Sequence, residues 1–203
     1  MTGTAASAAL RQRISDVLMS DSCQRIDYRW GPYHIDGWAY TAVALSAIGA
    51  SRSLHIAVGH LPATSGAQYD PNANTLRVPS VNFASPGNAS VGWERMTIVH
   101  ECTHAAVDQM RRAPRVLYRS NEVLAYVGGT LFNLYEGRPY APWAGSVSIV
   151  AERVANAIKD SPGAIIGPAA DVQALETAIT NSATYTFLRR RPHTMTRNSG
   201  LPF

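Results

Sequence analysis

Apolar residues recur every three to four positions in several parts of the chain, which is the spacing of helices with one buried face. These parts are about Ala5–Leu18, Ala39–Ile48, Trp93–Arg112, the stretch after Ser120, Val147–Lys159 and Ala169–Asn181. Glycine and proline punctuate them, since Pro114 follows the third and the segment Glu136–Pro139 follows the fourth. The pattern therefore predicts a helix-rich domain.

Strand patterns lie between the second and third of these helices. Ser53–Gly59 is typical of one strand, and Ala67–Tyr69 and Thr75–Pro79 are typical of a hairpin around the turn Asp70–Asn74. Leu76–Val78 is the candidate edge strand, because Pro79 and Pro86 are unsuited to central strands, although an ordinary hairpin is equally open. Together the patterns predict an α+β domain with a small sheet whose edge strand precedes the third helix.

Length and charge favour one neutral domain followed by a basic tail. The 203 residues suit a single domain with a sizeable core. The net charge of +4 belongs to Arg189, Arg190, Arg191 and Arg197, because the other 14 of the 18 basic residues balance the 14 acidic ones. We expect a domain over residues 1–184 and a flexible basic tail over residues 185–203, with no nucleic-acid partner, because nucleic-acid binding needs a basic face.

Several features bear on the compartment. No apolar run approaches the length of a membrane-spanning helix, and the first residues lack the apolar region of a secretory signal. Cys23 and Cys102 are the only cysteines, which argues against a disulfide framework. We therefore expect a cytoplasmic protein with no membrane partner, while export that needs no cleaved signal stays open.

The strongest chemical signal lies inside the third helix, where His100-Glu101-Cys102-Thr103-His104 form an HExxH motif. Residues i and i+4 share one helix face, so the two imidazoles can bind a single ion. Glu101 lies about 100° round the helix, from where it can reach a metal-bound water without being a ligand. Composition alone gives an accidental HExxH with a probability of about 0.5%. The alternative is a helix whose two histidines make ordinary hydrogen bonds.

A catalytic zinc ion usually takes three protein ligands and keeps one open position. The pattern HExxHxxGxxH is absent, because the sequence here continues HECTHAAVDQM. Glu122 follows His104 by 18 positions and opens the next helix, after Pro114 has ended the first. A turn between the helices would bring Glu122 over the histidines, although a carboxylate favoured at a helix N-terminus is the alternative. The other downstream glutamates are less suitably placed: Glu136, Glu152 and Glu176.

HExxH followed by NExxAY, over Asn121–Tyr126, resembles the gluzincin (thermolysin-like) clan of zinc metallopeptidases, in a minimal bacterial form. The resemblance covers roughly residues 54–137 and is specific at five or six positions. It implies a zincin-like fold in which the edge strand before the HExxH helix binds extended peptide, main chain against main chain. It also implies that His100, His104 and Glu122 bind zinc and that Glu101 is the general base.

Two tyrosines are candidate donors to the oxyanion of a tetrahedral intermediate. Tyr126 is i+4 from Glu122 and shares its helix face, which makes it the first candidate. Tyr118, in the segment leading to Glu122, is the alternative donor. A buried tyrosine with a partnered hydroxyl is an equally open interpretation of Tyr126.

Other residues near the motif have plainer interpretations. Asp108 is i+4 from His104 and could support that ligand, but a surface aspartate is the favoured interpretation. Cys102 is expected to be a small core residue. His55 and His60 have no spacing that ties them to the motif, so neither is expected to bind metal.

These observations predict a zinc-dependent metallopeptidase that acts on a peptide or protein substrate. Imidazole and carboxylate ligands suit Zn²⁺. One alternative is a non-catalytic, zinc-stabilised binding or scaffold domain, whose fourth coordination position is closed by a protein group. Another is a toxin or effector peptidase that acts on one protein and has a dedicated partner or immunity protein.

Overall fold

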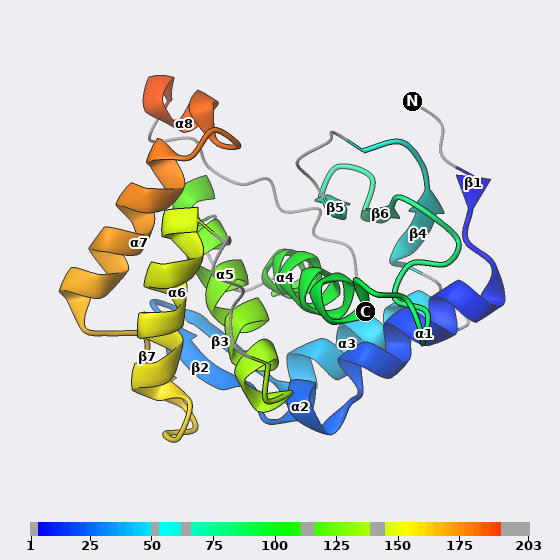
Figure 1. Ribbon diagram of the computed structural model, residues 1–203, viewed down its shortest axis with the longest axis horizontal. Coiled ribbons are helices and arrows are strands. Elements are labelled where there is room, and N and C mark those ends of the chain that lie inside the picture. The colour runs from blue at the N-terminus through cyan, green and yellow to red at the C-terminus, as the bar shows by residue number, and fades with distance from the viewer. Residues whose placement is uncertain (1–3, 50–52, 62–65, 111–115, 139–144, 192–203) are drawn as a thin grey trace.

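The computed structural model describes residues 4–49, 53–61, 66–110, 116–138 and 145–191. These residues form one helix-rich α+β domain, which confirms the predicted class (Figure 1). The helices are α1 (Ala8–Leu18), α2 (Asp21–Gln24), α3 (Gly37–Ile48), α4 (Val91–Gln109), α5 (Tyr118–Tyr135), α6 (Gly145–Ile158), α7 (Ala169–Asn181) and α8 (Thr186–Arg190). The strands are β1 (Thr4–Ala5), β2 (Asp27–Trp30), β3 (Tyr33–Asp36), β4 (His55–Val58), β5 (Gln68–Asp70), β6 (Thr75–Val78) and β7 (Ala164–Ile165).

Helix α4 runs through the middle of the molecule (Figure 1). Helices α5, α6 and α7 are layered on one side of it, and α1, α3 and the sheet that contains β4, β5 and β6 lie on the other. Ile98, Val99 and Cys102 of α4 are buried in the core. The HExxH helix is therefore positioned by packing on both sides, and Cys102 is the core residue that the sequence predicts.

The larger sheet has the strand order β1-β4-β6-β5. Strand β6 pairs in parallel with β4 and antiparallel with β5, where Tyr69 lies opposite Leu76. The prediction that Leu76–Val78 forms the edge is therefore wrong, because β6 has a neighbour on each side. Pro79 follows the last paired residue and so does not obstruct that pairing. The edge strand next to α4 is β5.

A second sheet, with the order β3-β2-β7, has no counterpart among the predicted strands. Strands β2 and β3 form a tight hairpin through Gly31, whose φ of +56° is a conformation that glycine adopts readily. Strand β7 pairs in parallel with β2. Tyr28 and Ile35 of the hairpin are fully buried, so this sheet belongs to the core that supports the site helices.

The predicted helices are confirmed, with shifts at their ends. Helix α4 has Ser90 as its N-cap, and the Ser90 hydroxyl and the Asn88 side-chain amide both donate to Glu94 at 2.8 Å. It ends at Gln109, before the predicted end near Arg112. Residues 111–115, with the proposed stop at Pro114, lie outside the described residues.

Buried phenols and a glycine set the approach of α5 to α4. The Tyr40 hydroxyl is 2.8 Å from Thr103 Oγ1 of α4, and the Tyr28 hydroxyl donates to the Leu124 carbonyl of α5 at 2.7 Å. A Cβ added at Gly128 would lie 2.6 Å from the Tyr40 oxygen and 2.8 Å from Thr103 Oγ1. The close contact of the two helices therefore depends on the missing side chain at position 128.

The substitution Gly128→Ala is expected to lower the free energy of unfolding by about 1–3 kcal/mol, the usual cost of overpacking a core. Gly129→Ala is the matched control, because its Cβ would have its nearest contacts at 3.4 Å, an ordinary van der Waals distance. Urea denaturation of both variants measures the difference. Equal stability of the two variants would contradict the close-approach argument.

Candidate metal centre

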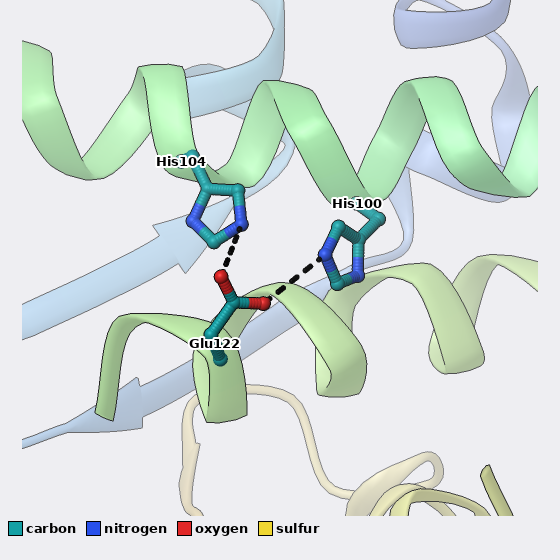
Figure 2. Close-up of side chains that lie close together, drawn as sticks. All are labelled: His100, His104 and Glu122. Atoms are coloured by element: carbon teal, nitrogen blue, oxygen red, sulfur yellow. Dashed lines mark ion pairs between the residues drawn. The ribbon is translucent and has the colours of Figure 1, made fainter. Parts of the chain in front are cut away.

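Helices α4 and α5 bring the three predicted ligands together (Figure 2). His100 and His104 project from α4 towards Glu122 of α5. His100 Nε2 lies 3.5 Å from Glu122 Oε2, and His104 Nε2 lies 3.6 Å from Glu122 Oε1. The side chains of His100 and His104 are 14% and 12% exposed and that of Glu122 is 4% exposed, so the cluster is shielded but still reaches solvent.

These separations fit a shared metal ion better than direct hydrogen bonds. Ordinary N–H···O bonds measure about 2.7–3.2 Å, so contacts of 3.5 and 3.6 Å are too long. In a tetrahedral zinc site with bonds of about 2.0–2.2 Å, the ligand atoms lie about 3.3–3.6 Å apart. The ligand atoms of His100, His104 and Glu122 all lie within 4.8 Å of one another. Two imidazoles and one carboxylate are also a donor set used by catalytic zinc.

Within the part of the chain that the structure describes, this is the one group of three or more His, Cys, Asp or Glu side chains placed to share an ion. His55 and His60 are exposed and lie outside it. Cys102 also lies outside it, and burial raises the pKa of its thiol.

His104 and Glu122 each favour the charged form of the other. Burial lowers the pKa of His104, but the negative charge of Glu122 opposes burial, and the net effect raises the pKa to about 9. Burial would raise the pKa of Glu122, yet His104 and His100 hold it well below its usual range. Glu122 is therefore an anion at neutral pH, as a metal-binding carboxylate must be.

Glu101 is held by the main chain of the edge strand. The backbone N–H of Tyr69 in β5 donates to Glu101 Oε2 at 2.8 Å. Burial raises the pKa of Glu101, His100 and His104 lower it, and Glu122 raises it again, with a net increase. A carboxylate whose pKa is raised towards neutrality is suited to accept and return a proton.

Tyr69 also connects Glu101 with Asp108 at the end of the same helix. The Tyr69 hydroxyl donates to Asp108 Oδ2 at 2.7 Å and lies 2.8 Å from Asn74 Oδ1. Asp108 is only 3% exposed, so its interpretation as a surface aspartate is wrong. The sequence could not show this, because Tyr69 reaches Asp108 across 39 positions. Asp108 therefore helps to anchor the edge strand against α4.

Aromatic residues line the other side of the cluster. The ring of Tyr126 meets the ring of His100 edge-on, at 4.7 Å between centroids and an angle of 82°. Tyr118 lies near Glu122, and burial followed by the Glu122 charge raises the pKa of its hydroxyl. Both predicted oxyanion donors therefore lie at the site, and the choice between them stays a prediction.

A third phenol, which the sequence analysis missed, contacts the cluster directly. The Tyr185 hydroxyl donates to Glu122 Oε2 at 2.6 Å, and both residues are buried. Burial, the charge of Glu122 and a hydrogen bond with Tyr126 raise the pKa of Tyr185, so its hydroxyl stays protonated. No local spacing could have pointed to this residue, because 63 positions separate it from Glu122.

The position of Tyr185 also corrects the predicted boundary of the domain. Residues 185–191, which we assigned to a flexible tail, include helix α8. Tyr185 and Leu188 are buried in the core cluster, and the apolar pair Phe187-Leu188 is the sequence signal for it. The folded domain therefore extends at least to Arg191, and the rest of the predicted tail lies outside the described residues.

Comparison of the chain with protein-family models, with curated proteins and with solved structures finds no match. The resemblance to gluzincins therefore stays a prediction from the motif residues. Among the described residues no helix has the length and apolar character needed to cross a membrane.

Proposed function

We propose that this protein is a zincin-like, zinc-dependent metallopeptidase whose metal ligands are His100, His104 and Glu122. The observation that carries the proposal is the position of the Glu122 carboxylate, which faces both imidazole nitrogens at 3.5 and 3.6 Å. What zinc supplies when bound is Lewis acidity, which polarises the scissile carbonyl and makes a coordinated water more acidic.

Glu101 is the proton carrier in this proposal. Its Oε2 is held by the Tyr69 N–H, which fixes the orientation of the carboxylate and leaves Oε1 to take a proton from the attacking water. Oε1 then passes the proton to the leaving amine. The raised pKa of Glu101 supports both transfers, because it moves the carboxyl group away from the ordinary acidic value and towards the operating pH. Tyr126 or Tyr118 would donate to the oxyanion.

Strand β5 supports a peptide as the substrate. It is an edge strand, and the N–H of Tyr69 is directed at Glu101 rather than at β6. The outer edge of β5 therefore faces the catalytic carboxylate. An extended peptide that pairs with this edge would pass along the site with its main chain within reach of Glu101.

The number of ligands separates this proposal from a zinc-stabilised scaffold. A structural site closes the coordination sphere with four protein groups, whereas a catalytic site keeps one position open. The cluster found among the described residues contains three, and the half-buried carboxylate of Glu101 lies next to it. Both features favour a catalytic site.

Removal and return of metal test the function. We expect the purified full-length chain to contain about one zinc per molecule and to cleave members of a mixed peptide library, with the products identified by mass spectrometry. Dialysis against 1,10-phenanthroline should abolish cleavage, and added zinc should restore it. Cleavage that continues in fully metal-depleted protein would contradict the proposal.

A further inference from the structure

The hydrogen bond between Tyr185 and Glu122 links the end of the described chain to the metal centre. Its length of 2.6 Å is that of a strong phenol–carboxylate bond, and it lies in a buried environment. The acceptor is Oε2, one of the two carboxylate oxygens that face the imidazoles. Tyr185 is therefore placed to control how the Glu122 carboxylate is turned.

The segment that carries Tyr185 is docked firmly on its surroundings. Leu188 is fully buried, and the ring of Phe187 meets that of Tyr118 edge-on at 5.0 Å between centroids. The Arg189 guanidinium donates to the carbonyl oxygens of Thr180 and Asn181 at the end of α7. These contacts hold the Tyr185 hydroxyl at a fixed point above α5.

Tyr185 acts through Glu122 and not on the substrate. A phenol has one proton to donate, and here that proton is given to Oε2. The bond leaves Oε1, which faces His104, available as the metal-binding oxygen. Groups that hydrogen-bond a metal ligand orient it, and their loss typically weakens metal affinity about 10- to 100-fold.

We propose that Tyr185 is a positioning residue for Glu122, and that it couples the docking of the segment 185–191 to metal binding. The inference rests on the ligand set of the proposed function. Coupling between two binding events is reciprocal, so a contact that improves metal binding must also make bound metal stabilise the docked segment.

Zinc affinity of Tyr185→Phe is the first test. Phenylalanine keeps the buried ring and removes only the donor. Titration of the full chain with zinc, in competition with a chromophoric chelator, should show affinity about 10- to 100-fold weaker than that of the wild type. The visible absorption bands of the cobalt(II)-substituted protein should also change, because they depend on the geometry of the metal ligands.

Tyr135→Phe is the matched control. Tyr135 lies on α5, the helix that carries Glu122, and its hydroxyl donates to the Lys159 carbonyl at 2.7 Å. Tyr135 lies about 20 Å along the helix axis from Glu122. The variant therefore also loses a hydrogen bond donated by a phenol, but at a distance from the metal centre. Its zinc affinity and its cobalt spectrum should equal those of the wild type.

Hydrogen exchange supplies a second test. In the wild type, added zinc should slow exchange of the amides of residues 185–191, and this effect should be lost in Tyr185→Phe. Two results would overturn this inference and leave the proposed function standing. One is a Tyr185→Phe variant with wild-type zinc affinity and an unchanged cobalt spectrum. The other is hydrogen exchange that zinc does not alter in the wild type. A wild-type chain that binds no zinc would overturn the proposed function as well.

Discussion

Replacing Glu101 with glutamine is expected to lower kcat/KM for peptide hydrolysis about 10³-fold or more while zinc stays bound, because general acid–base groups typically contribute 10²- to 10⁴-fold. The amide has nearly the shape of the carboxylate, and its oxygen can still accept the N–H of Tyr69, a bond that measures 2.8 Å in the wild type. It cannot take a proton from water. Steady-state kinetics on a cleaved library peptide and metal analysis of the same sample measure the two effects.

Glu94→Gln is the matched control for this variant. Glu94 is a buried glutamate on the same helix as Glu101, and it accepts hydrogen bonds from the Ala84 N–H and from the side chains of Asn88 and Ser90. Loss of the Glu94 carboxylate should lower the free energy of unfolding without changing kcat/KM for peptide hydrolysis. If Glu101→Gln retained wild-type kcat/KM, the assignment of Glu101 as the general base would be wrong.

Removing a ligand is expected to weaken zinc binding severely. Zinc at about 1,000 times its dissociation constant stabilises a folded chain by about 4 kcal/mol. For a chain of this size that corresponds to a rise in Tm of roughly 8–16 °C. His100→Ala and Glu122→Ala should lose this rise, and their zinc affinity should fall by more than the 10- to 100-fold typical of changes to groups that only support a ligand. Thermal denaturation with and without zinc, together with metal analysis, measures both effects.

His55→Ala is the control for the ligand variants, because His55 is an exposed histidine on β4 outside the cluster. It should keep the zinc content and the zinc-dependent rise in Tm of the wild type. Equal zinc content in the wild type, His100→Ala and Glu122→Ala would refute the ligand assignment.

The helices were predictable because each depends on local spacing. The apolar period of α7 gives the bounds Ala169–Asn181 that the structure shows. The i, i+4 geometry of His100 and His104 follows from the helix itself, which is why the motif could be interpreted before any tertiary contact was known. Glu122 could be proposed from its distance along the chain to the motif, although only the packing of α5 on α4 brings its oxygens to the two imidazoles.

The edge of the sheet and the second sheet were less predictable because strand neighbours are chosen by long-range pairing. Pro79 suggested that the strand before it was an edge, but the pairing of β6 with β4 left that position to β5. The hairpin of β2 and β3 has a sequence signal in its Gly31-Pro32 turn, but helical and strand periods do not detect such a turn.

By itself, then, the sequence determined the helix-rich α+β class, the pair of histidines with Glu101 beside them, and the candidate third ligand, because these depend on short-range geometry. The tertiary structure decided that Tyr69 holds Glu101, that Asp108 is buried, and that Tyr185 donates to Glu122. These three features depend on contacts of Tyr69 with Glu101, of Tyr69 with Asp108 and of Tyr185 with Glu122, between residues 32, 39 and 63 positions apart. Such contacts exist only once the packing of the whole domain has brought distant elements together, and no period or spacing along the chain encodes them.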